Sequence, residues 1–257
     1  MTTTHGIRTF LGLSAGPAVA YGLSRFAYGL LLPTMKQGLS LSYAQAGAIT
    51  TANNIGYLGG AVLAAFFVKG GNAKSAFTAG MLLTVPTLAA TGMTHALWLI
   101  YVLRALSGLS AAVALVAGGV LASHAGGDDQ RRSSLAINVY YAGGGLGILG
   151  SALIALIPAL QDAQNWPLGW YVLAVLTLLC GGVAFMSARG VEVRPAAAAP
   201  SRWGARLDAR LVRTAAAYFC FGLGHVVYIT FIVAYLRERG ATPVSYTHLT
   251  LPTIYSV

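Results

Sequence analysis

The stretch Ala105–Gly127, ALSGLSAAVALVAGGVLASHAGG, decides the fold because it holds no charged residue and can cross a bilayer. A helix needs about 20 apolar residues to span the hydrocarbon core. Comparable uncharged runs recur along the chain, and another, Thr9–Met35, is broken only by Arg25. The remaining runs are Gln37–Val68, Ser75–Leu103, Ser133–Gln161, Ala163–Ala188 and Thr214–Leu236. This pattern predicts an all-α, polytopic membrane protein.

The composition supports the same class. Hydrophobic residues make up 56% of the chain and charged residues only 9%, whereas about 25% are charged in soluble proteins. The net charge of +10 could indicate nucleic acid binding, but the basic residues lie between the apolar runs. In that position they set membrane topology, so we expect a lipid bilayer as partner and no nucleic acid.

Seven spans are predicted, and the loop charges orient them. Their approximate ranges are 10–32, 43–68, 75–93, 96–123, 133–159, 168–188 and 214–236. With a cytoplasmic N-terminus, the inner segments hold eleven Lys and Arg residues and the outer segments three. The positive-inside rule therefore favours a cytoplasmic N-terminus.

The spacing of the spans divides the chain into parts. Residues 1–188 form a predicted six-helix unit, 189–213 a basic cytoplasmic loop, and 214–243 a seventh helix. Secondary transporters are often built from two such six-helix halves, so we expect a transporter cut off early in its second half. The tail 244–257, VSYTHLTLPTIYSV, is similar to translated sequencing-adapter bases and is predicted to be foreign. A genuine short tail is the alternative.

Arg25 is the first candidate site residue because it lies midway along the first span. Placing an arginine at the bilayer centre costs roughly 2.5–3.5 kcal/mol, so it normally faces a polar cavity or a partner. Tyr21 and Tyr28 lie four residues before it and three after it, which predicts one shared helix face. Arg25 and Tyr28 are candidate contacts for an anion or another substrate. A structural arginine bound to helix carbonyls is the alternative.

Four further polar residues lie within predicted spans. Arg104, in the fourth span, could line a cavity or extend to the membrane surface. Asn53 and Asn54, in the second, could contact substrate or bridge helices. His225, in the seventh, suits proton coupling because histidine changes charge near neutral pH, but a structural role is equally open.

The acidic residues all lie outside the predicted spans, in loops or at span ends. The chain therefore offers no mid-membrane carboxylate pair, no metal-ligand cluster and no nucleophile with a neighbouring base. We expect a protein that is not an enzyme and needs no cofactor or metal. A membrane-embedded enzyme is disfavoured on the same ground.

Glycines in the fifth span predict close helix packing. Gly143 and Gly147 form a G-x-x-x-G pair, and Gly150 follows on the same segment. Small residues at this spacing let two helix backbones approach each other. A phosphate-binding loop is excluded because no strand precedes the glycines and no Gly-Lys-Ser/Thr follows them.

Three segments resemble motifs of the major facilitator superfamily. Arg104–Ala112 is similar to the fourth-helix motif, and Gly143–Gly150 resembles the glycine-rich fifth-helix motif without its usual proline. Val68–Lys74 lies where the signature loop between helices 2 and 3 belongs, but its customary aspartate is missing. The resemblance implies the N-terminal half of that fold plus helix 7.

A more specific resemblance is to the YbfB/YjiJ-type branch of bacterial transporters. It rests on the segments Ser24–Pro33, Leu41–Gly47 and Thr51–Gly59. This implies a secondary active transporter of a small solute in the bacterial inner membrane. It would work by alternating access, be proton-linked, and be monomeric when complete. By implication Arg25 and Arg104 line its central cavity. A seven-helix receptor or sensor is the alternative, although it would normally have an extracellular N-terminus.

Overall fold

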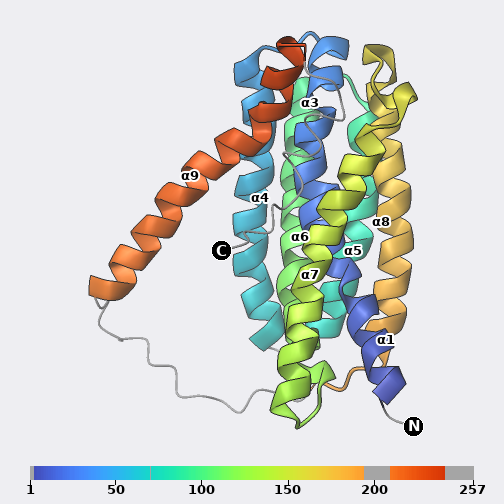
Figure 1. Ribbon diagram of the computed structural model, residues 1–257, viewed down its shortest axis with the longest axis vertical. Coiled ribbons are helices and arrows are strands. Elements are labelled where there is room, and N and C mark those ends of the chain that lie inside the picture. Colours follow the sequence, from blue (N-terminus) through green and yellow to red (C-terminus); the bar gives the residue numbers. More distant parts are fainter. Residues whose placement is uncertain (1–2, 70, 194–208, 241–257) are drawn as a thin grey trace.

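The computed structural model describes residues 3–69, 71–193 and 209–240, which are almost entirely helical and contain no strand. Two short 3-10 helices, η2 (Pro158–Leu160) and η3 (Ala163–Asn165), connect the long helix that ends at Ala155 to the one that begins at Trp166. Six described helices are long and apolar enough to cross a membrane. They are α4 (Tyr43–Lys69), α5 (Ala73–Met93), α6 (Leu97–Ala125), α7 (Gln130–Ala155), α8 (Trp166–Arg189) and α9 (Ala209–Glu238). The predicted all-α polytopic fold is confirmed, and Figure 1 shows a bundle of long helices.

The first helical segment corrects the expectation of one regular helix over 10–32. It consists of α1 (Thr3–Leu13), α2 (Ala15–Pro17), the π-helix η1 (Ala18–Phe26) and α3 (Ala27–Gly38). Pro17 has no backbone N–H to donate, so it interrupts the regular hydrogen-bond ladder where the π-helix begins. A π-helix bonds i to i+5, so its turn is wider and its side chains leave the α-helical spacing.

Helix α7 packs closely on this first segment through two glycines. A Cβ atom at Gly143 would overlap the carbonyl oxygen of Ser14, and one at Gly147 would overlap that of Ala18. Only glycine allows the two backbones to lie so near each other. At Gly150, the third glycine predicted to pack, a Cβ atom would meet no described atom within 4 Å.

A second glycine contact, not predicted from the sequence, joins α4 to α6. Cβ atoms at Gly56 and Gly60 would overlap the carbonyl oxygens of Ala105 and Leu109. These two glycines are also four residues apart, so the G-x-x-x-G signal was present in the second span. The contact fixes α4 against α6, which is the most buried of the spanning helices.

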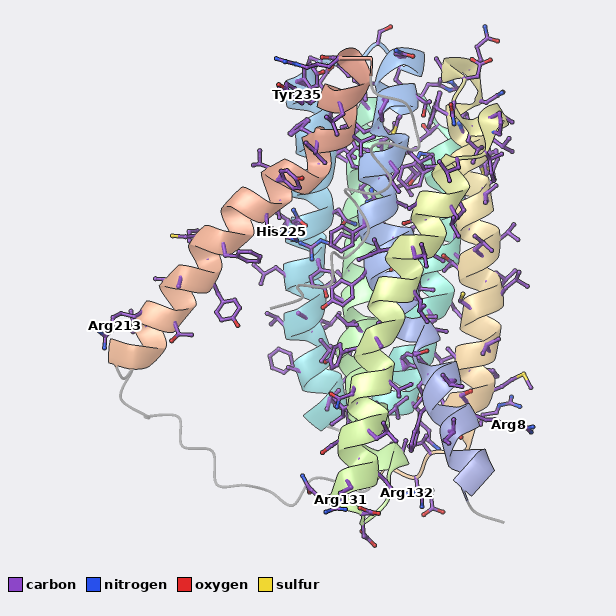
Figure 2. All side chains as sticks on the ribbon, in the orientation of Figure 1. Arg8, Arg131, Arg132, Arg213, His225 and Tyr235 are labelled. Atoms are coloured by element: carbon purple, nitrogen blue, oxygen red, sulfur yellow. The ribbon has the colours of Figure 1, made fainter. Side chains whose placement is uncertain are left out.

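Tight turns separate the helices at the end of the bundle where Figure 2 labels Arg131 and Arg132. The side chain of Asp129 caps α7 by accepting a hydrogen bond from the backbone N–H of Arg131 at 2.9 Å. Gly127 has a φ of 68°, a conformation that favours glycine, and ends the turn after α6.

Helix α9 differs from the others because it contacts the bundle mainly near one end. Figure 1 shows its C-terminal end beside the bundle and its N-terminal end diverging from it. Lys36 Nζ of α3 lies 3.4 Å from Glu238 Oε1 of α9, and the Tyr43 hydroxyl donates a hydrogen bond to the same carboxylate. The ring of Phe231 packs edge-on against Tyr43, with centroids 5.8 Å apart. We call Lys36, Tyr43 and Glu238 the α9 contact.

Most of the predicted basic loop 189–213, and the proposed foreign tail 244–257, lie outside the described residues. The domain boundaries predicted from the sequence therefore stay predictions.

Candidate functional site

Arg104 lies in the interior of the helix bundle, with only 1% of its surface exposed. Its Nη2 donates a hydrogen bond to the carbonyl oxygen of Ser24 at 2.9 Å. Its Cζ lies 5.0 Å from the ring centroid of Trp170 and 5.6 Å from that of Tyr28. Among the described residues no carboxylate lies within 4.0 Å of it. The charge is therefore held by a carbonyl and two aromatic faces, as a cation–π contact allows.

A chain of polar contacts extends from Arg104 across four elements. Asn53 of α4 donates a hydrogen bond from Nδ2 to the Arg104 carbonyl at 3.0 Å. The hydroxyls of Ser24 and Ser107 lie 2.8 Å apart, which joins the first segment to α6. The chain continues through Ser110, whose hydroxyl lies 2.9 Å from that of Thr84 on α5. The Asn53 amide and the four hydroxyls gain partners inside the bundle, which fits the helix-bridging alternative for Asn53. Nε and Nη1 of Arg104 are buried without a hydrogen-bond partner in the described part of the chain.

Tyr28 belongs with Arg104, which corrects the expected shared face of Tyr21, Arg25 and Tyr28. It is 2% exposed, and its hydroxyl donates a hydrogen bond to the Ala46 carbonyl at 2.9 Å. Its ring stacks on that of Trp170, with centroids 6.3 Å apart. The prediction assumed α-helical spacing, whereas the π-helix around Arg25 turns the following residues to another side.

Arg25 lies in a different setting, at the side of the bundle that α9 approaches. It is half-buried, and its Cζ lies 5.0 Å from the ring centroid of Tyr57 on α4 and 6.0 Å from that of Phe26. The Phe26 ring in turn contacts His225 of α9, with centroids 6.5 Å apart. No described carboxylate lies within 4.0 Å of Arg25. We call Arg25, Phe26, Tyr57 and His225 the Arg25 site.

The two remaining predicted site residues are Asn54 and His225. Asn54 lies one turn before Tyr57 on α4, and its Oδ1 is buried without a hydrogen-bond partner in the described part of the chain. His225 is exposed, and its ring stacks on Phe221 at a centroid distance of 5.1 Å. This amide oxygen is therefore an unused hydrogen-bond acceptor one turn of α4 from Tyr57.

The structure thus separates the predicted site residues into two groups. Tyr28 and Asn53 gather around buried Arg104, while His225 lies near Arg25. Sequence reasoning missed Trp170, which supplies the face under Arg104, because nothing in the sequence connects the sixth span to the fourth. Among the described residues no group of three or more His, Cys, Asp or Glu side chains could hold a metal ion.

Comparison with known proteins extends over nearly the whole chain. A family model described as "Uncharacterised MFS-type transporter YbfB" matches residues 17–251, which include every candidate site residue. This confirms the resemblance seen in the sequence. No curated protein matches the chain.

Proposed function

Since the chain belongs to the family described as the uncharacterised MFS-type transporter YbfB, we propose that it moves a small anionic solute across the membrane by alternating access. The family makes the protein a multi-pass membrane transporter, and nothing in the described residues favours the seven-helix receptor. The solute would bind at the Arg25 site.

One observation carries this proposal: Arg25 is only half-buried, and its charge has no described carboxylate partner. A full charge inside a membrane is costly unless it is paired or hydrated. Arg25 is half-buried beside Tyr57 and so keeps part of its surface accessible, whereas Arg104 is fully enclosed. An anionic group on the solute would complete the pair through charge-assisted hydrogen bonds.

The place of α9 supports alternating access. It contacts the bundle at the Lys36 end and diverges from it toward the other end, as Figure 1 shows. If the N-terminus is cytoplasmic, the α9 contact closes the outer side while the inner side is open. We further propose that 1–188 is the first half of the transporter, that 214–243 begins the second, and that the complete protein is a monomer of the bacterial inner membrane.

A ligand screen on the purified protein tests the proposed substrate class. The panel contains small carboxylates, phosphate and sulfonate esters, and neutral or cationic analogues of matched size. A ligand at 100 times its dissociation constant stabilises a protein by about 2.7 kcal/mol, so binders raise the melting temperature measurably. We expect the stabilising compounds to carry an anionic group. Equal stabilisation by their neutral analogues would contradict the proposal.

Replacing His225 with glutamine should remove the dependence of uptake on a proton gradient. The Phe26 ring contacts both His225 and Arg25, so a change of charge at His225 would alter the field that attracts the anion. Uptake of an anion found in the screen is measured in proteoliposomes with and without the gradient. His124→Gln, at the end of α6, is the matched control and should behave as the wild type. If uptake by His225→Gln still depends on the proton gradient, His225 does not couple transport to protons.

Replacing Glu238 with glutamine should weaken the α9 contact. The hydrogen bond from Tyr43, and then Lys36, hold the pKa of Glu238 below its ordinary value. The charged contact is therefore complete above the ordinary carboxyl pKa and is lost as the pH falls through the lowered value. Spin labels at Gln37 and Arg239 should report longer distances in the variant, and in the wild type at acid pH.

Glu192→Gln provides the control for this experiment, because Glu192 is an exposed carboxylate that follows α8 at the opposite end of the bundle. Its distance distribution should match that of the wild type. If Glu238→Gln also leaves the distribution unchanged, the ion pair does not hold α9.

A further inference from the structure

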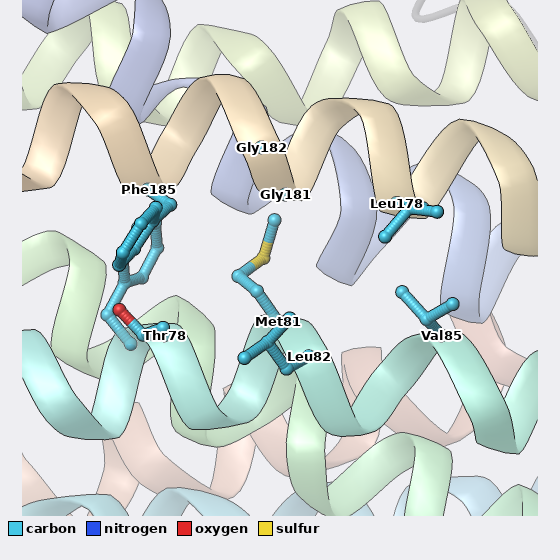
Figure 3. Close-up of a pocket in the computed structure, with 9 residues that line it drawn as sticks. Thr78, Met81, Leu82, Val85, Leu178, Gly181, Gly182 and Phe185 are labelled. Atoms are coloured by element: carbon cyan, nitrogen blue, oxygen red, sulfur yellow. The ribbon is translucent and has the colours of Figure 1, made fainter.

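Helices α5 and α8 face each other across an apolar groove with a volume of about 160 Å³. Figure 3 shows the side chains of the two helices on either side of it. It is lined by Met81, Leu82 and Val85 of α5 and by Leu178, Gly182 and Phe185 of α8. Leu82 is 58% exposed and Leu178 is 54% exposed, so the groove opens on the outer surface of the bundle. In a membrane this surface meets lipid chains.

The groove continues into a second, more open cavity of about 440 Å³. The two cavities share Thr78, Leu82 and Phe185, and the second adds Lys74 and Arg189 at the ends of their helices. One continuous surface therefore runs from an apolar interior to a cationic mouth.

Contacts between the helices hold the two cations at this mouth. Lys74 Nζ donates a hydrogen bond to the carbonyl oxygen of Arg189 at 3.2 Å. The Arg189 Cζ lies 4.3 Å from the ring centroid of Phe185. In the described part of the chain, neither cation has a carboxylate within 4.0 Å. Their charges remain available to an anion.

We propose that this surface binds one anionic glycerophospholipid, with its phosphate at Lys74 and Arg189 and an acyl chain in the groove. Basic pockets between membrane helices bind anionic headgroups in this way. The eleven residues from Lys74 to Val85 rise about 17 Å along α5. That depth is about half of the hydrocarbon core, as one leaflet of a bilayer requires. The mouth lies at the membrane face predicted to be cytoplasmic.

Native mass spectrometry of the detergent-purified protein tests this proposal. The protein is mixed with phosphatidylglycerol or with phosphatidylcholine that carries the same acyl chains. We expect one phosphatidylglycerol to be retained in preference to phosphatidylcholine. Each cation near a membrane surface contributes about 1 kcal/mol, a factor of about five, so K74Q/R189Q should lose this preference by about tenfold or more. Equal retention of the two lipids by the wild type would overturn the proposal.

The double variant R8Q/R131Q is the matched control for charge. It removes two exposed arginines outside the groove, from the end of the bundle that Figure 2 labels, and should retain phosphatidylglycerol as the wild type does. If both double variants lose the preference for phosphatidylglycerol equally, the preference depends on total positive charge. That result would contradict a defined site.

Filling the groove tests the position of the acyl chain. A Cβ atom at Gly182 would meet no described atom within 4 Å, so G182L can fold while its side chain occupies the groove. Retention of both lipids should fall in this variant. Unchanged retention would place the acyl chain elsewhere and overturn that part of the assignment. The melting temperature of each variant identifies any that fail to fold, in which case K74Q alone is tested in place of the double variant.

Discussion

Replacing Arg25 with alanine is expected to abolish transport while the helical bundle stays folded. Arg25 supplies the unpaired positive charge of the proposed anion site. Hydrogen bonds to a charged group contribute about 1.5–3 kcal/mol each, so anion affinity should fall by about 100-fold. The measurement is uptake in proteoliposomes, together with ligand-induced stabilisation of the purified variant. Unchanged transport would leave Arg25 a structural role only.

Two other variants show whether the effect comes from the charge at this position. Arg25→Lys keeps the charge but not the planar fork of donors, so partial binding should remain. Arg104→Gln instead removes a cation that is packed between Tyr28 and Trp170. Its free energy of unfolding should fall by about 3 kcal/mol, with anion binding retained in the folded fraction. A loss of binding without a loss of stability in Arg104→Gln would place the site at Arg104.

Replacing Gly147 with leucine is expected to prevent stable folding. A Cβ atom there would overlap the carbonyl oxygen of Ala18 and lie 2.5 Å from its Cα, so α7 would have to move away from the first segment. Gly22, one turn after Ala18 on the same π-helix, also packs on the backbone of Gly147. Overpacking costs about 1–3 kcal/mol where neighbouring side chains can shift to make room. Here the overlapping atoms belong to the backbone, which cannot shift in the same way. We therefore expect a loss of about 3 kcal/mol or more, measured as yield and melting temperature.

Gly150→Leu on the same helix is the control for this substitution. It introduces the same side chain where no described atom lies within 4 Å of the new Cβ. The free energy of unfolding should change by no more than about 0.5 kcal/mol. If the free energy of unfolding falls equally in both variants, leucine destabilises the protein for a reason other than the contact with Ala18.

The sequence predicted the long helices because charge is excluded from a bilayer whatever the helices pack against. Spans such as 43–68 and 75–93 match α4 and α5 within two residues at each end. The close approach at Gly143 and Gly147 was also predictable, since the G-x-x-x-G spacing acts within one helix. Gly56 and Gly60 carry the same signal and could have been found in the same way.

The arrangement of the site could not be predicted, because it depends on contacts between distant segments. Arg25 and Tyr28 were placed on one face by assuming an α-helix, and the π-helix separates them. Arg104 could be recognised as a charge within a span, but its partner Trp170 lies on another helix. Residue spacing gives the face of a regular helix, and it gives no information on which helix lies opposite.

The single-ended attachment of α9 makes this helix a lever. At 1.5 Å per residue its 30 residues extend about 45 Å, and its pivot lies at Glu238. A tilt of 10° about that pivot would move the far end by about 8 Å. His225, thirteen residues from the pivot, would move by about 3 Å, enough to break its ring contact with Phe26. Small changes at the α9 contact would thus be amplified at the Arg25 site.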